Sequence, residues 1–269
     1  MSIVEIFGYL GALLVGVSLG LTGGGGSILA LPVMVYLHHK SPEIARTYSL
    51  FIIGSGALIG VIQNYFLKRV NYKIALGFVS PSLIAIYLTS KFIYPLIPSI
   101  LFNINDVVIT KPIFLMILFA FVMLIAGGFM IKKGMSDSKN DDLQDTKINY
   151  FMIIILGLLT GTLTELLGAG GGFIIVPALV VFAKLPMKLA IGTSLLIIFI
   201  NSLLGIIFHI NTENVDWTYL GIFTSIALVG ILVGTYLTKF INGNLLKIYF
   251  GIFVLIMGCF IIIEKIFIK

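Results

Sequence analysis

The chain has 269 residues, of which 59% are apolar and 10% are charged, and its formal net charge is +6. Soluble domains carry about 25% charged residues, so this composition excludes the soluble class. The lysines and arginines lie mostly between apolar runs rather than in one cluster, so no nucleic-acid partner is expected. The continuous apolar runs are long enough to cross a hydrocarbon core of about 30 Å as helices. These features predict an all-α polytopic protein of the cell membrane.

The first apolar stretch covers residues 3–37 and is interrupted by glycines. Residues 20–27 read GLTGGGGS, and Pro32 follows them. Inside a helix, glycine costs about 1 kcal/mol relative to alanine, and proline costs about 3 kcal/mol. A continuous helix over this stretch, rising about 1.5 Å per residue, would reach about 52 Å. A single kinked helix and a hairpin both fit the break, and the excess length favours the hairpin.

Three unbroken spans follow this stretch, and a polar segment at 136–147 comes after them. That segment is rich in Asp, Lys and Ser and reads as a solvated linker. After it a second broken stretch begins, and three further spans follow. The predicted spans are 47–66, 72–90 and 112–132 in the first half, and 190–208, 217–238 and 246–266 in the second, where the broken stretch covers 149–183.

The two halves are copies related by an offset of 145 residues. Residues 167–172 read LGAGGG, and Pro177 follows them as Pro32 follows the first cluster. The same offset also aligns further glycine, alanine and serine positions without gaps, among them Ser49 with Ser194 and Gly60 with Gly205. The sequence therefore predicts one repeat at 1–135 and another at 148–269. Each repeat would consist of a glycine-broken, hairpin-like segment and three or more transmembrane helices.

The charges of the loops predict that the two repeats are inverted. The loop at 68–73 is basic, whereas the equivalent loop of the second half carries Glu213 and Asp216 and no cation. Because cytoplasmic loops are enriched in Lys and Arg, the bias has changed sides between the halves. This predicts a cytoplasmic central linker and places both termini outside. Lys40 and Arg46, which would then lie in an outer loop, argue against this topology.

Two broken helices at matching places in a membrane protein point to a binding site between the repeats. A short helix begins after each break, and helix N-termini attract anions through free N–H groups and the helix dipole. Close helix packing is the alternative use of such glycines. The predicted substrate-binding residues at the breaks are Thr22, Gly23, Gly24, Gly25, Gly26, Ser27, Gly168, Gly170, Gly171 and Gly172.

Hydroxyl groups at the predicted start of the next span are further candidates for binding the substrate. They are Thr47 and Ser49 in the first half and Thr193 and Ser194 in the second. Such hydroxyls either cap their own helix or donate a hydrogen bond to a bound anion.

Three polar residues near or within apolar spans complete the set of candidates. Glu165 precedes the second glycine cluster, where the first copy has Gly20. A buried carboxylate there would be a proton-coupling candidate, and a position near the membrane surface is the alternative. Asn201 serves either as a substrate ligand or as a contact between helices. Arg46 either snorkels to the interface or contacts the substrate.

The sequence carries no set of residues expected for catalysis or metal binding. No Ser-His-Asp set or carboxylate pair converges on an apolar face, and the single cysteine, Cys259, has no His or Cys cluster beside it. The protein is therefore not expected to be an enzyme, and no cofactor and no metal site are predicted.

The paired glycine–proline segments and the motif AIGTSL at 190–195 resemble the TauE/SafE sulfite exporter family of membrane permeases. The resemblance covers essentially the whole chain. It implies transport of small sulfur-containing anions such as sulfite, sulfoacetate or thiosulfate. The first half departs from the Gly-Thr-Ser pattern, because Thr47, Tyr48 and Ser49 stand in its place.

The sequence thus predicts a secondary transporter of a small anionic substrate, driven by a proton or another ion and embedded in the lipid bilayer. A carrier of another small anion or carboxylate, or a passive channel-like or accessory membrane protein, is the alternative. The sequence leaves open whether the chain forms a homo-oligomer.

Overall fold

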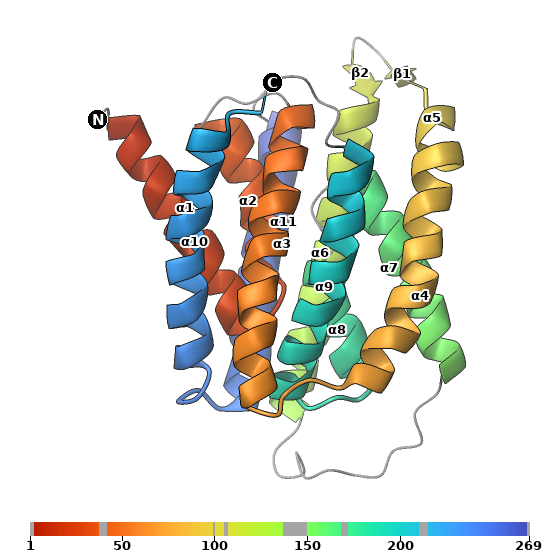
Figure 1. Cartoon of the computed structure of the whole chain (residues 1–269). Helices are drawn as coiled ribbons and strands as arrows, with labels where there is room; N and C mark the ends of the chain where they lie inside the picture. Colours follow the sequence, from red (N-terminus) through yellow and green to blue (C-terminus); the bar gives the residue numbers. More distant parts are fainter. Residues whose placement is uncertain are drawn as a thin grey trace.

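The computed structural model describes residues 3–37, 42–98, 100–104, 107–136, 150–167, 172–209 and 215–267. Within these ranges, six helices are long and apolar enough to cross a membrane, and shorter apolar helices accompany them. The helices stand side by side in one bundle, and α1 begins at the same end of the bundle at which α11 finishes (Figure 1). The predicted all-α polytopic membrane fold is confirmed.

The first half contains one broken segment and three long helices. It opens with α1 (Ile3–Thr22), α2 (Gly25–Pro32) and the π-helix η1 (Val33–Leu37). The long helices are α3 (Pro42–Phe66), α4 (Tyr72–Leu88), which continues through η2 (Thr89–Ile93) into α5 (Tyr94–Leu96), and α6 (Lys111–Ser136).

The second half repeats this order. The short segments are α7 (Tyr150–Leu167), α8 (Gly172–Pro177) and the π-helix η3 (Ala178–Phe182). The long helices are α9 (Met187–His209), α10 (Trp217–Leu237) and α11 (Gly243–Phe267). The two π-helices both follow a proline and differ by the same 145 residues, so the repeat is visible in the backbone as well as in the sequence. Proline lacks the N–H that an α-helical bond needs, which favours a local change of helical pitch.

The chain folds back on itself at the first glycine break. A Cβ built on Gly26 would lie 2.6 Å from the Leu19 Cβ and would overlap the carbonyl oxygen of Val15. In a continuous helix, residues this far apart in sequence would be separated by about 16 Å along the axis at 1.5 Å per residue. The α1–α2 segment is therefore a hairpin, as predicted.

Helices of one half pack mainly against helices of the other half. The extensive contacts join α1 with α10, α4 with α7, α3 with α9, and α6 with α11. Exchanging the two halves converts the α1–α10 pair into the α7–α4 pair and leaves the other two pairs unchanged. The two sequence repeats therefore do not form separate bundles.

Contacts between individual residues show the same equivalence between the two halves. Gly16 lies against Ala227 and Gly230, and Gly161, its equivalent, lies against Ser82 and Ala85. The partners are equivalent too, because Ala227 corresponds to Ser82 and Gly230 to Ala85 under the offset of 145 residues. Across the α3–α9 contact, Gly60 faces Leu195 and Gly205 faces Leu50, which again are equivalent positions. Small residues at these positions let helix backbones approach closely in a membrane.

The last helices of the two halves, α6 and α11, also make equivalent contacts, but the offset between equivalent residues is different there. Gly134 faces Asn244 and Lys247, and Gly258 faces Ala120 and Met123. These contacts match when the offset is 124, so the first half carries 21 more residues than the second before its last helix. Most of this insertion lies in the extension of α4 and in an antiparallel hairpin, β1 (Ile100–Ile104) and β2 (Val107–Thr110). The sequence analysis did not predict these strands.

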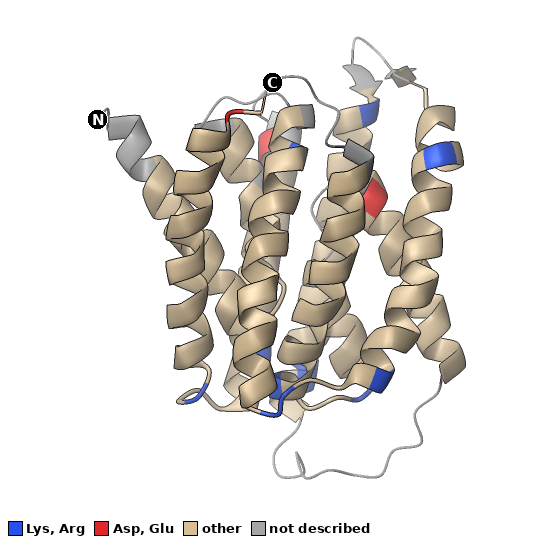
Figure 2. Cartoon of the chain, viewed as in Figure 1, with Lys and Arg blue, Asp and Glu red and all other residues tan. Residues whose placement is uncertain are grey.

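The charged residues are distributed unevenly between the two ends of the bundle. Figure 2 shows Lys and Arg gathered at the lower end, where α3 connects to α4, α6 ends, η3 leads into α9, and α10 connects to α11. The basic loop at 68–73, expected in the cytoplasm, thus lies at the same end as the Lys-bearing connections of the second half. In Figure 1, α1 starts from the upper end and α7 from the lower end.

Candidate functional site

The first glycine break begins where α1 ends, at Gly23. Its φ of +73° lies in the left-handed region, where glycine is favoured because it has no Cβ. The Thr22 hydroxyl holds this turn, because its Oγ1 donates to the Ser18 carbonyl at 2.7 Å and accepts from the Gly25 N–H at 2.8 Å. Thr22 therefore caps the start of α2 as well as being a predicted substrate ligand.

The two breaks meet inside the bundle. A Cβ built on Gly172 would lie 3.1 Å from the Gly24 Cα and 3.2 Å from the Ser27 Oγ, and one built on Gly24 would overlap the Gly172 carbonyl oxygen. Gly24 stands at the N-cap of α2, and Gly172 begins α8. The starts of two short helices, one from each half, therefore touch, and only glycine fits where they do.

Helix α9 presents one face to this contact. Ser194 Oγ lies 2.8 Å from the Gly23 carbonyl and 2.8 Å from the Ile191 carbonyl, either of which can accept its single proton. One turn later, the Ile198 side chain reaches to within 2.7 Å of a Cβ position on Gly172. Asn201 follows after a further turn on the same face, since residues spaced by three and four share one side of a helix.

The hydroxyls expected at helix starts lie in helix interiors instead. Helix α3 begins at Pro42 and α9 at Met187, so the predicted starts at 47 and 190 are wrong by five and three residues. Both helices extend past the apolar spans into polar sequence. Thr193 donates to the Leu189 carbonyl within α9 and accepts from the Asn71 N–H at 3.0 Å, so it binds the α3–α4 connection.

Ser49 and Thr47 are buried, and the Ser49 hydroxyl has no hydrogen-bond partner among the residues that the structure describes. Ser27, also fully buried, donates to the Gly24 carbonyl at 2.7 Å. Gly23, Gly24, Gly25, Gly26 and Gly172 are all buried at the break. Gly168, Gly170 and Gly171 lie outside the described residues.

Asn201 is joined to α4 through one of its two polar atoms. Its Oδ1 accepts from the Ser82 hydroxyl at 2.8 Å, whereas its Nδ2 is buried and has no partner in the described part of the chain. The neighbouring Ser202 hydroxyl and the Thr164 hydroxyl of α7 are likewise buried without a described partner. Buried polar groups are normally hydrogen-bonded, so these groups are candidates for ligand contacts.

Glu165 is buried and forms an ion pair with Arg46. The Arg46 Nη2 lies 2.7 Å from the Glu165 Oε1 and donates to the Glu165 carbonyl at 2.8 Å. The Glu165 side chain is 4% exposed and that of Arg46 14% exposed. Sequence reasoning treated the two residues separately, and the structure brings them together. The pair joins the first turns of α3 to the last turn of α7, at the end of the bundle opposite the basic connections (Figure 2).

Six buried or half-buried polar residues of α3, α4, α7 and α9 have no polar counterparts in the other half. Under the offset of 145, apolar residues or glycine occupy the equivalent positions. The pairs are Ser82 with Ala227, Thr164 with Leu19, Glu165 with Gly20, Asn201 with Gly56, Ser202 with Ala57, and Arg46 with Ile191. Sequence analysis missed Ser82, Ser202 and Thr164, although comparing the two repeats position by position would have revealed them.

Comparison with known proteins agrees with this architecture. The family model described as Sulfite exporter TauE/SafE matches residues 9–261. A "Probable membrane transporter protein" of Xylella fastidiosa (strain 9a5c) is 30% identical over 253 residues, covering 93% of this chain and 91% of the relative. The "Probable membrane transporter protein YunE" of Bacillus subtilis (strain 168) is 27% identical over 264 residues, covering 92% and 93%. With its multi-pass helical bundle, the chain belongs to the TauE/SafE family of membrane transporters, which are not enzymes.

Proposed function

We propose that this protein is a secondary transporter of small sulfur-containing oxyanions such as sulfite, sulfoacetate or thiosulfate, coupled to a proton or another ion. The observation that carries the proposal is the contact between the starts of α2 and α8 at Gly24 and Gly172. The partial positive charge of helix N-termini attracts an anion without a permanent cation beside it.

The surroundings of this contact suit a small oxyanion. Ser27 and Ser194 place hydroxyls beside it, and Asn201 lies two turns along α9 from Ser194 with an unused N–H donor. Glu165, the carboxylate just before the second break, is paired with Arg46. An oxyanion at the break would exchange its hydration for the Asn201 amide donor and for the Ser27 and Ser194 hydroxyls, which would turn away from the carbonyls to which they donate.

The ion pair is the candidate coupling element. Glu165 and Arg46 bridge α7 and α3, so protonation of the carboxylate would weaken a link between helices that move during transport. Because the extensive contacts run between halves, we propose that the α1–α10 and α4–α7 pairs move as units against the α3–α9 and α6–α11 pairs. The inverted orientation of the repeats is part of this proposal.

A flux assay with purified protein in liposomes tests the proposed substrate class. Sulfite, thiosulfate, sulfoacetate and sulfate are supplied separately, with acetate as a carboxylate control, in the presence and absence of a pH gradient. We expect saturable flux of at least one sulfur oxyanion, accumulated uphill by the gradient. Preference for acetate would refute the substrate class, and flux that follows only the substrate gradient would refute coupling.

A further inference from the structure

A pocket of about 230 Å³ opens between the lower ends of α3 and α10, on the seam between the two halves. Gln63, Phe66 and Leu67 line it from α3 and its connection, and Thr235, Tyr236 and Lys239 line it from α10 and the turn after it. Its residues are remote in sequence from the glycine breaks, although Thr235 packs against Gly20 just before the first break. The proposed transport function does not use them.

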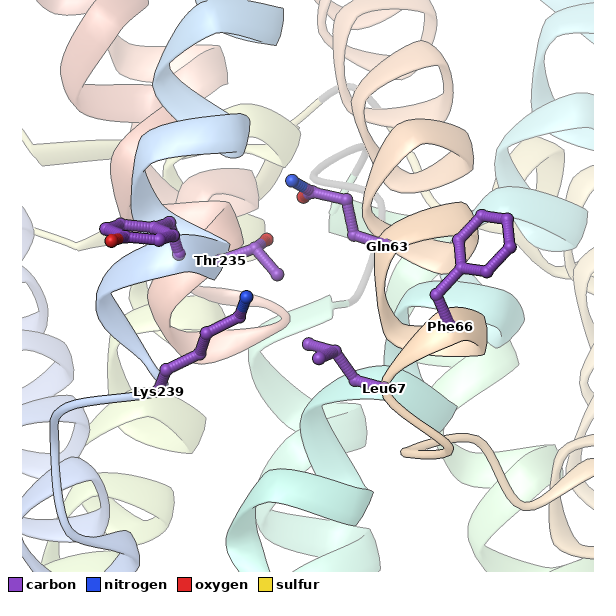
Figure 3. A pocket seen from close by; sticks show the side chains of 6 residues that line it. Gln63, Phe66, Leu67, Thr235 and Lys239 are labelled. Carbon is purple, nitrogen blue, oxygen red and sulfur yellow. The ribbon is translucent and has the colours of Figure 1, made fainter.

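The polar atoms of this pocket lack protein partners. The Thr235 hydroxyl and the Gln63 Oε1 are buried and unpartnered in the part of the molecule that the structure describes, and Thr235 is 1% exposed. Figure 3 shows Gln63 and Thr235 pointing toward one another, with the Lys239 amine below them. A hydroxyl, an amide and an ammonium group thus converge on one space, and buried polar groups of this kind call for a ligand.

Lys239 carries a charge that no described carboxylate neutralises. Its nearest aromatic partner is Tyr236, whose ring centroid lies 5.3 Å from the Nζ. Arg69, the next cation, is used elsewhere, because its Nη1 donates to the Thr238 hydroxyl at 3.1 Å. The whole lower end of the bundle is basic (Figure 2). A ligand that complements this charge would be an anion.

The apolar part of the lining indicates what the anion is attached to. Phe66 is 77% exposed and Tyr236 is 55% exposed, and Tyr65 and Phe240 add further exposed rings at the same level. Exposed tyrosines such as Tyr65 and Tyr236 gather at the depth of the lipid headgroups in membrane proteins. Lysines at this depth attract anionic lipids. A freely dissolved anion would gain nothing from this apolar rim.

We propose that this pocket binds the phosphate group of an anionic phospholipid, with Lys239 and the Thr235 hydroxyl contacting the phosphate oxygens and Phe66 and Tyr236 contacting the apolar chains. In phosphatidylglycerol, the glycerol hydroxyl would also supply a donor to the Gln63 Oε1. Inorganic phosphate shares the oxyanion chemistry but lacks the apolar chains.

Fluorescence quenching by brominated lipids tests this proposal at the pocket itself. Trp217, the only tryptophan, starts α10 at the other end of that helix. Trp217→Phe combined with Phe66→Trp moves the reporter to the pocket rim. We expect brominated phosphatidylglycerol to quench this reporter at about fivefold lower mole fraction than brominated phosphatidylcholine, the ratio expected from about 1 kcal/mol for one cation near a membrane surface.

Two variants and one matched control test whether the pocket binds a phospholipid phosphate rather than inorganic phosphate or no specific anion. Lys239→Gln and Thr235→Val should each abolish or reduce the preference for phosphatidylglycerol, whereas Lys73→Gln, an exposed lysine in the first turn of α4 at the same end, should retain it. Equal loss in Lys239→Gln and Lys73→Gln would overturn the proposal in favour of unspecific surface charge. Displacement of the lipid by millimolar inorganic phosphate would overturn it in favour of a soluble anion. Unchanged preference in Thr235→Val would also contradict it.

Discussion

At the scale of single residues, the contact between Gly24 and Gly172 leaves no space for a side chain. A methyl group on Gly24 would overlap the Gly172 carbonyl oxygen, so the two helix starts would have to separate. Overpacking of this kind costs about 1–3 kcal/mol. We therefore expect Gly24→Ala to lower the melting temperature and to reduce anion flux in liposomes to background.

A glycine with free space provides the control for this variant. A Cβ on Gly221 of α10 would have no neighbour within 4 Å, so Gly221→Ala should leave both stability and flux unchanged. Wild-type flux in Gly24→Ala would contradict the binding role of the break. A loss of flux in Gly221→Ala would show that flux responds to alanine substitutions unrelated to the glycine contact.

A substitution of Asn201 can distinguish a structural role of this residue from a substrate-binding role. The fold uses only its Oδ1, in one bond to Ser82, and polar contacts between membrane helices average about 0.6 kcal/mol. Asn201→Leu should therefore change stability by less than about 1 kcal/mol, yet lower flux strongly because the Nδ2 donor is lost. Comparing thermal unfolding with flux in the same preparation measures both effects. A large loss of stability with normal flux would assign Asn201 to helix packing alone.

At the scale of the elements, the Arg46–Glu165 pair joins α3 to α7 at one point. Removing one partner of a buried ion pair costs about 3–5 kcal/mol, because the other charge stays buried. Replacing both partners with well-packed apolar residues of similar volume is often neutral. The other repeat shows which residues to introduce, since it has Ile191 and Gly20 at these positions. We expect Glu165→Gly to destabilise the protein far more than the double variant Arg46→Ile with Glu165→Gly.

Transport as a function of pH tests the coupling role of the same pair. Glu165→Gln removes the titratable group, so the pH dependence of flux should flatten even where the variant remains folded. An unchanged pH profile would exclude Glu165 as the coupling site. Equal stability of the single and double variants would show that the pair contributes little to holding α3 and α7 together.

At the scale of the whole molecule, the basic end of the bundle predicts the orientation in the membrane. Lys73 and Lys239 follow connections at the lower end, and the positive-inside rule places that end in the cytoplasm. In a Cys259→Ser background, a cysteine at Lys73 or Lys239 should resist an impermeant maleimide added to intact cells. A cysteine at Thr218, exposed at the start of α10, should react. The reverse labelling pattern would invert the proposed topology.

Much of this architecture could be predicted because the repeat leaves a direct trace in the sequence. The apolar runs predicted the long helices, and the paired glycine–proline segments predicted the broken ones. The β1–β2 hairpin could not be found from the offset of 145, because the insertion lies beyond the region where that offset holds. The helix starts at Pro42 and Met187 were missed because apolar content marks the membrane-embedded part of a helix rather than its hydrogen-bonded end.

The sequence offers both glycine breaks, Ser194, Asn201 and Glu165 as candidate site residues, and their binding and coupling roles stay predictions. It could not show that Thr193 faces the α3–α4 connection or that Arg46 reaches Glu165, since these contacts depend on which faces of distant helices meet. Helical periodicity gives the faces of each helix, but it does not identify their partners across the bundle.

The ion pair has a consequence for the direction of transport. In a symmetric exchanger, the conformation open to one side is the image of the conformation open to the other, and the two have similar free energies. Here the ion pair between α3 and α7 has no equivalent between α9 and α1. The positions that correspond to Arg46 and Glu165 are Ile191 and Gly20, which carry no charge. The two open conformations should therefore be unequally populated, and we expect the carrier to rectify, with a different apparent substrate affinity on each side of the membrane.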